Sequence, residues 1–153
     1  MDLTSPRTIR NIQEQFGFTF KKGLGQNFLT SRNILEEIVD AAEIESGVIE
    51  VGPGFGVLTS ELAQNSDKVV TIEIDERLID VLNYTLAEYD NVKIINEDIL
   101  KLDLKKVIDD EFNGEKVSIA ANLPYYITTP IITKLLEEKL PIKNIVVMVQ
   151  KEV

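Results

Sequence analysis

The stretch VIEVGPGFG, residues 48–56, decides how this chain folds. It begins with an almost entirely apolar run and ends with three glycines that alternate with Pro53 and Phe55. A short apolar run that stops at glycines is typical of a buried strand, and the next segment, VLTSELAQ, has the composition of a helix. The stretch therefore predicts a buried strand, a glycine turn and a helix whose N-terminus faces whatever the turn encloses.

Apolar runs and helical segments continue to alternate towards the C-terminal end. Further strands are predicted at 68–74, 92–96, 116–121 and 144–149. Five short apolar strands separated by helices indicate a parallel, doubly wound α/β sheet, whose ligands bind beyond the carboxyl ends of the strands. The helices are expected at 57–64, at 76–89 with Asp75 as cap, near 104–112, and at 130–139 with Thr129-Pro130 as start signal.

The first 45 residues precede this alternation and have a different organisation. Ser5-Pro6 predicts the start of a helix that ends near Phe16, and Ser31 predicts the cap of a second helix. A glycine-rich loop joins the two. The expected units are N-terminal helices with a basic arm at 1–45 and the α/β core at 46–153.

The chain contains no cysteine and no histidine among its 153 residues. Without cysteine there is neither a disulfide nor a thiolate metal site, and without histidine the commonest general base and metal ligand is missing. Catalytic triads that need histidine are excluded, and we expect no metal. No apolar run reaches 18 residues and the first residues are polar, so we expect no membrane span, no signal peptide and a cytoplasmic location.

The charge is unevenly distributed along the chain. The net charge of −10 argues against a nucleic-acid partner, but residues 1–35 carry five basic and two acidic side chains, a balance of +3. The remaining residues carry 11 basic and 24 acidic side chains, a balance of −13. A basic arm on an acidic body is compatible with RNA contact by the arm, and a merely solvated basic face is the alternative.

Glycines and acids stand at the predicted carboxyl ends of the strands. Gly52, Gly54 and Gly56 let the backbone turn tightly and let a ligand approach the main chain. They do not complete the dinucleotide fingerprint, because residue 57 is valine, so the loop alone is weak evidence for a nucleotide-type ligand. Glu73 follows 21 residues after Gly52, a distance at which a carboxylate can accept hydrogen bonds from both ribose hydroxyls. An ordinary solvated acid is the alternative.

Two more strand ends carry polar side chains. Asp98, in NEDIL, is placed to accept a hydrogen bond from the exocyclic amine of adenine, and the cap of a local turn is its alternative role. Asn122 ends the fourth strand and starts NLPYY, where paired tyrosines replace the small polar residues usual in turns. Together these strand ends describe a site for an adenosine-bearing ligand. ATP held through its phosphates is not expected, because the chain has no Walker lysine motif.

Five ordered motifs carry a resemblance to a known family. They are LGQNFL (24–29), EVGPGFGVLT (50–59), TIEID (71–75), NEDIL (96–100) and NLPYYITTPI (122–131). Together they resemble the ribosomal-RNA adenine N6-dimethyltransferases, which use S-adenosylmethionine on a Rossmann-like, class I methyltransferase fold. NLPYYITTPI is similar to the small-subunit (16S rRNA) branch. The erythromycin-resistance branch, which acts on large-subunit RNA, more often has Asn-Ile-Pro-Tyr at this place.

The resemblance implies a cofactor site along the strand ends. Two residues of the glycine-rich loop would contact the methionine end of S-adenosylmethionine, and two glycines would line it through their backbone. Glu73 would hold the ribose, Asp98 and Ile99 the adenine, and Asn122 would lie beside the departing methyl group. The implied cofactor-binding residues are Asn27, Leu29, Gly52, Gly54, Glu73, Asp98, Ile99 and Asn122.

The resemblance places the target adenine at the end of the fourth strand. The side-chain oxygen of Asn122 and the carbonyl of Leu123 or Pro124 would accept hydrogen bonds from the two N6 protons, which aims the nitrogen lone pair at the methyl group. Tyr125 would stack on the base, which must leave its RNA stack to be reached. For Tyr126, packing against the sheet edge is the favoured interpretation.

The implied activity is dimethylation of adjacent adenines of small-subunit rRNA in immature 30S particles. Family members are considerably longer than this chain, which ends in VQKEV. We therefore expect an N-terminal part without the C-terminal helical domain, poorly active, with an exposed fifth strand that favours self-association. The alternatives are a large-subunit methyltransferase of the erythromycin-resistance type and a non-catalytic RNA-binding or ribosome-assembly module. A nicotinamide dehydrogenase is disfavoured by Val57 and by the absence of histidine.

Overall fold

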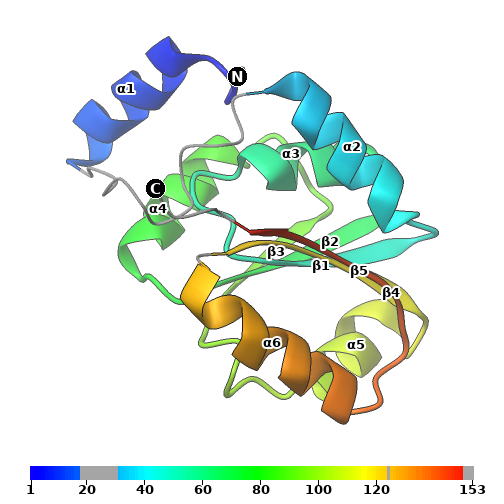
Figure 1. The fold of residues 1–153 in the computed structure, drawn as a ribbon. Coiled ribbons are helices and arrows are strands. Elements are labelled where there is room, and N and C mark those ends of the chain that lie inside the picture. The colour runs from blue at the N-terminus through cyan, green and yellow to red at the C-terminus, as the bar shows by residue number, and fades with distance from the viewer. Residues whose placement is uncertain (18–30, 124, 150–153) are drawn as a thin grey trace.

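The computed structural model describes residues 1–17, 31–123 and 125–149 (Figure 1). Its strands are β1 Gly47–Val51, β2 Lys68–Glu73, β3 Val92–Asn96, β4 Val117–Leu123 and β5 Ile142–Val149. They form one parallel sheet in the order β3-β2-β1-β4-β5. The chain runs outward from β1 to β3 and then returns to the other side of β1. This reversal confirms the doubly wound α/β fold predicted from the apolar runs.

Helices cover both faces of the sheet. They are α1 Pro6–Phe16, α2 Arg32–Ala42, α3 Val57–Gln64, α4 Arg77–Thr85, α5 Leu104–Phe112 and α6 Tyr125–Glu137. Helices α2, α3 and α4 lie on one face with α1 packed against α4, whereas α5 and α6 lie on the opposite face (Figure 1). The arrangement leaves the carboxyl ends of the strands between the two helical layers.

The face towards α5 and α6 is lined by an aliphatic cluster. Alternate residues of β1, β2 and β4 point to it because side chains alternate across a strand. The strand residues of this cluster are Ile49, Val51, Val70, Ile72, Ile95, Val117, Ile119, Ala121, Leu123, Ile142, Ile145 and Val147. Burial of these side chains removes a continuous apolar surface from water, and this hydrophobic contribution is the main one that holds the sheet to these helices.

The structure corrects the predicted bounds of two helices. Helix α6 begins at Tyr125, five residues before the expected start at Pro130, which lies inside the helix. Ile127, Ile131 and Leu135 recur every fourth residue and pack into the aliphatic cluster, so packing extends the helix through the turn that contains the proline. Helix α4 ends at Thr85 and not at residue 89.

Strand β5 forms one edge of the sheet and pairs with β4 within the described residues. Self-association through this edge stays a prediction, as does the division of the chain after residue 45.

Helix α2 contributes Leu35 and Ile38 to a cluster that also contains Val48 and Ala120 of the sheet. Among the residues that the structure describes, no helix is long and apolar enough to cross a membrane.

Candidate functional site at the carboxyl ends of the strands

The glycine turn follows β1 and lies between β1 and β4, the two strands at which the strand order reverses. Gly52 has a φ of +75°, and a Cβ built on it would lie 3.1 Å from the carbonyl oxygen of Asn122 on β4. A side chain at this position would therefore press on the neighbouring strand end. Gly54 has a φ of +58°, and no described atom lies within 4 Å of its Cβ position. The turn thus combines tight packing against β4 with an open side at Gly54.

A buried hydroxyl holds the far side of the turn. Thr85 Oγ1, in the last turn of α4, donates a hydrogen bond of 2.8 Å to the carbonyl oxygen of Phe55. Thr85 and Phe55 are both buried. The turn is therefore tied to α4 as well as to β1, and its shape depends on that contact.

Glu73 lies at the end of β2 and is 6% exposed. Its Oε2 accepts a hydrogen bond of 2.9 Å from the backbone N–H of Asp75. Burial raises the pKa of the Glu73 carboxyl, while hydrogen bonds from the backbone amides of Asp75, Ile74 and Gly54 oppose this shift. The Gly54 contact places the carboxylate beside the glycine turn, and the burial excludes the interpretation of Glu73 as a solvated acid.

Asp98 shapes the loop that follows β3. Its Oδ1 accepts a hydrogen bond of 2.9 Å from the N–H of Leu100. Its carbonyl oxygen accepts hydrogen bonds of 3.0 Å from the N–H groups of Lys101 and Leu102. Asp98 therefore caps a local turn, the alternative role considered for it, and its contact with adenine stays a prediction. Ile99 packs its side chain into the aliphatic cluster, and its carbonyl oxygen accepts a hydrogen bond from Lys134 of α6.

The end of β2 is joined to the end of β3. Asn96 Nδ2 donates hydrogen bonds to the carbonyl oxygens of Glu73, at 2.8 Å, and Ile74, at 3.3 Å. The position of Glu73 is therefore linked to the strand that leads into the Asp98 loop. In the sequence, Asn96 is only the first residue of the motif NEDIL, and its hydrogen bonds to the end of β2 were not predicted.

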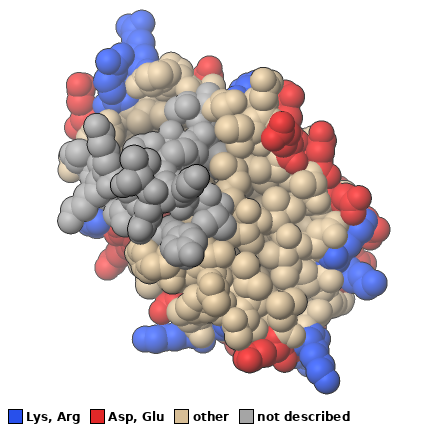
Figure 2. Space-filling view, viewed as in Figure 1, with Lys and Arg blue, Asp and Glu red and all other residues tan. Residues whose placement is uncertain are grey.

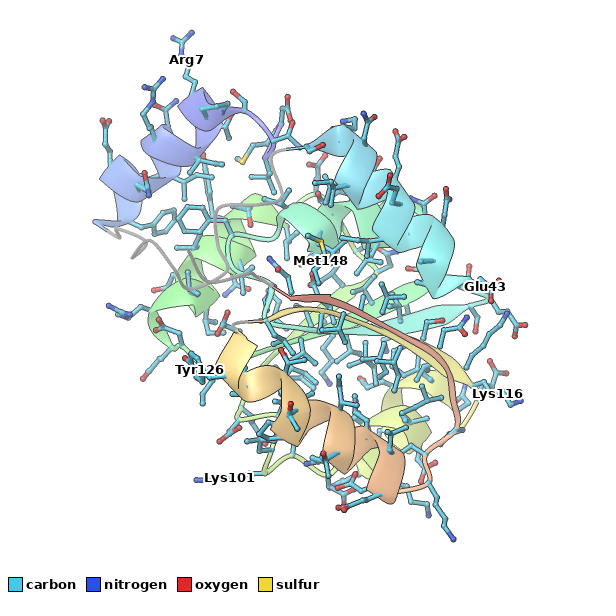
Figure 3. The ribbon with its side chains drawn as sticks, in the orientation of Figure 1. Arg7, Glu43, Lys101, Lys116, Tyr126 and Met148 are labelled. Atoms are coloured by element: carbon cyan, nitrogen blue, oxygen red, sulfur yellow. The ribbon has the colours of Figure 1, made fainter. Side chains whose placement is uncertain are left out.

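Asn122 and Leu123 are the last residues of β4. Asn122 is half-buried, and Leu123 packs its side chain into the aliphatic cluster. Tyr126, in the first turn of α6, is 68% exposed and points away from the helical layer (Figure 3). The predicted packing of Tyr126 against the sheet edge is wrong, because Ile127 takes the side of the helix that faces the sheet.

Several predicted site residues lie outside the described part of the structure. They are Asn27, Leu29, Pro124 and the side chain of Tyr125. The structure does bring the other predicted residues together at the carboxyl ends of the strands. They are Gly52, Gly54, Glu73, Asp98, Ile99, Asn122 and Leu123.

Glu50 is a buried acid for which the sequence motifs predicted no role. It is 1% exposed on β1, and its Oε1 accepts hydrogen bonds from the hydroxyls of Thr59, on α3, and Thr71, on β2, the latter at 2.8 Å. Burial raises the pKa of the Glu50 carboxyl to about 7, the two hydroxyls oppose the shift, and the charge of Glu73 adds to it. The available signal was an acid inside the otherwise apolar run VIEV.

The described residues contain no group of three or more histidine, cysteine, aspartate or glutamate side chains that could hold a metal ion. The site is thus made of backbone, carboxylates and an amide, and these groups suit a ligand with hydroxyl and amine donors.

The family comparison agrees with the five motifs. The profile of the family "Ribosomal RNA adenine dimethylase" matches residues 17–153. The chain belongs to this family. Ribosomal RNA small subunit methyltransferase A of Bacillus mycoides (strain KBAB4) is 56% identical to it over an alignment of 155 positions, which covers 99% of this chain and 53% of that protein. The chain therefore spans about half the length of the curated relatives it matches.

Solved structures of related enzymes share the fold. The 23S rRNA methyltransferase ErmE has a TM-score of 0.70 and 32% identity, and the match covers 81% of this chain and 48% of that one. A dimethyladenosine transferase from Plasmodium falciparum has a TM-score of 0.65 and 34% identity, with 79% and 42% covered. These likenesses confirm the class I methyltransferase fold that the resemblance implied.

Proposed function

We propose that this chain is the S-adenosylmethionine-binding part of an rRNA adenine N6-dimethyltransferase that acts on adjacent adenines of small-subunit (16S) rRNA. The observation that supports it is the meeting of the glycine turn, Glu73 and Asp98 on neighbouring strand ends, beside Asn122. An enzyme with this substrate works in the cytoplasm, on immature 30S particles.

The donor groups fit S-adenosylmethionine. Neighbouring strands lie about 5 Å apart, so acids at the ends of β2 and β3 are spaced for the ribose and the base of one adenosine. Glu73 would accept from the two ribose hydroxyls and Asp98 from the adenine amine, while Asn27 and Leu29 would meet the methionine end. No described atom lies within 4 Å of the Cβ position of Gly54, so the described residues leave room for the ligand against the backbone. When bound, the cofactor supplies an electrophilic methyl group on a sulfonium.

The residues after β4 would prepare the acceptor. The lone pair of N6 is delocalised into the adenine ring, and hydrogen bonds from both N6 protons to the Asn122 oxygen and a carbonyl of Leu123 or Pro124 favour a more tetrahedral nitrogen. Tyr125 would stack on the base, a contact worth roughly 1–3 kcal/mol. The amine loses its proton after it becomes cationic, so alignment and not an early general base carries the rate.

The small-subunit assignment rests on identity and on one motif. The Bacillus mycoides relative, named for the small subunit, is 56% identical, whereas the 23S rRNA methyltransferase is 32% identical. NLPYY also matches the pattern expected for the small-subunit branch. Incorporation of labelled methyl groups into small-subunit particles, measured against large-subunit RNA, distinguishes the two substrates. Because this chain is expected to be poorly active, binding to particles by a chain that does not bind S-adenosylmethionine is the result that would favour the non-catalytic module.

The RNA contact is proposed for the basic N-terminal arm. Arg7 on α1 points into solvent (Figure 3), and basic side chains project from the corner that α1 forms, whose basic residues are Arg7 and Arg10 (Figure 2). Arg32 is different, because it pairs with Glu61 on α3. Arg7 and Arg10 are therefore better placed than Arg32 to meet phosphates, with an affinity that falls as salt rises.

Calorimetric titration of S-adenosylmethionine tests the cofactor site. We expect Glu73→Ala to weaken binding by at least about 100-fold, because the two hydrogen bonds from the ribose to the carboxylate contribute about 1.5–3 kcal/mol each. Glu76→Ala, at an exposed position three residues later, is the matched control and should bind like the wild type. Equal affinities of the wild type and Glu73→Ala would rule out the ribose assignment.

A further inference from the structure

Lys134 of α6 reaches the loop that holds Asp98. Its Nζ donates hydrogen bonds of 2.8 Å to the carbonyl oxygen of Ile99 and of 2.7 Å to that of Leu102. The side chain of Lys134 is 12% exposed, and the Glu138 carboxylate lies 3.8 Å from Nζ, one helical turn further on. A lysine ammonium has three donors, so two of them serve this loop while the Glu138 carboxylate faces the ammonium.

These contacts act on the peptide that holds the Asp98 carboxylate. The carbonyl of Ile99 and the N–H of Leu100 belong to one planar peptide unit. Its oxygen accepts from Lys134, and its N–H donates to Asp98 Oδ1 at 2.9 Å. A cation on the carbonyl fixes the plane of this peptide and polarises its N–H, because linked hydrogen bonds strengthen one another. The orientation of the Asp98 carboxylate thus depends on Lys134.

The second contact of Lys134 holds the end of the same loop. The N–H of Leu102 donates to the Asp98 carbonyl at 3.0 Å, and the carbonyl of Leu102 accepts from Lys134. Lys101 lies in the same loop but is exposed and points into solvent (Figure 3). Lys101 has the same charge as Lys134 but does not make the hydrogen bonds of Lys134 to the loop carbonyls, so it serves as a control.

We propose that Lys134 is a positioning residue that sets the selectivity of the site for adenine. It is carried by the helix that starts directly after the Asn122 end of β4, so it ties the loop after β3 to the acceptor side of the site. The inference rests on the proposed function, because it assigns the base of the cofactor to the Asp98 loop. Lys134 touches neither base nor methyl group and acts through the Ile99–Leu100 peptide and Asp98.

The test compares two ligands that differ at one group. S-adenosylhomocysteine carries the adenine amine, and S-inosylhomocysteine carries a carbonyl oxygen in its place, which the Asp98 carboxylate repels. We expect the ratio of their affinities to fall by about tenfold or more in Lys134→Met, because the acceptor of the amine is no longer held. Lys134→Arg, which keeps donors for both carbonyls, should retain most of the ratio, and Lys101→Met should retain all of it.

The outcomes separate the inference from the proposed function. A purely structural Lys134 would weaken both ligands by the same factor, and an unchanged ratio in Lys134→Met would overturn the inference. A wild type that binds neither ligand, or both equally, would instead contradict the proposed function. If Lys134→Met does not fold, Lys134→Gln takes its place under the same criterion. Hydrogen exchange of the Leu100 amide in the wild type adds a second measurement: protection is expected, and exchange at the rate of an open loop would overturn the inference.

Discussion

The two faces of the sheet differ in chemistry although the same strands form both. Towards α5 and α6, the strand residues of the aliphatic cluster are all apolar. Towards α2, α3 and α4, the strands carry polar side chains, most of them near the carboxyl ends. Glu50, Thr71, Glu73 and Ser118 are buried, and Asn122 is half-buried.

The difference shows how one sheet can both hold the fold and bind a ligand. Burial of aliphatic side chains stabilises without any need for partners, and the polar strand residues on the face towards α5 are Lys68 and Lys93, which are not buried and pair with Glu111 of α5. Buried carboxylates cost free energy unless they find donors, as Glu50 does with Thr59 and Thr71. The polar face thus spends hydrogen-bond donors on its buried acids, and it holds the acids that a ribose-bearing ligand can use.

The largest expected effect on stability lies on the aliphatic face. Ile119→Ala should lower the free energy of unfolding by about 3–4 kcal/mol, because it removes a fully buried side chain from the aliphatic cluster and leaves a cavity. Denaturant titration measures the loss, and Ile119→Val, at about 1 kcal/mol, is the matched control. The folded fraction should bind S-adenosylhomocysteine with unchanged affinity. A weaker ligand affinity in Ile119→Val would show that the two faces are not separate in function.

The next effect concerns pH and Glu50. The pKa of its carboxyl is about 7 in the folded state and 4.5 in a model peptide. Between these values the unfolded chain releases a proton that the folded chain keeps, so stability falls as pH rises and the loss is complete above about pH 7. The wild type should lose about 3 kcal/mol relative to Glu50→Gln over this range.

Unfolding of both proteins at pH 4.5, 6 and 7.5 gives the difference directly, because other titrating groups contribute equally to each. A difference that does not change with pH would mean that Glu50 is ionised in the folded protein. The hydroxyls of Thr59 and Thr71 would then be sufficient to stabilise a buried charge on the polar face.

The smallest effect belongs to the glycine turn. Thr85→Val keeps the shape of the side chain but removes the hydroxyl that donates to the Phe55 carbonyl. We expect a loss of about 1–2 kcal/mol in the free energy of unfolding, together with weaker binding of S-adenosylhomocysteine, since the turn loses its tie to α4. Thr133→Val, at an exposed position on α6, should change neither quantity measurably. A Thr85→Val protein with wild-type affinity would show that α4 does not shape the ligand side of the turn.

Much of the fold could be read from local patterns. The bounds of α1, α3 and β3, and those of α5, agree with prediction, since apolar spacing and turn residues act within a few positions. The start of α6 could not be read in this way, because Pro130 is a start signal locally and is overruled by the packing of Ile127. The error for Tyr126 has the same origin: which side of a helix meets the sheet depends on where the helix begins.

For the candidate site, too, some properties could be predicted from the sequence and others depended on the tertiary structure. Motif order and spacing along the chain were sufficient to predict which residues stand at strand ends, because strand ends are marked by glycines, acids and amides that cannot continue an apolar run. Strand order and packing were needed to show that Glu73 is buried, that Glu50 shares its charge environment, and that Lys134 reaches the Asp98 loop from another element. Those properties depend on contacts between residues far apart in the chain, and no local pattern records them.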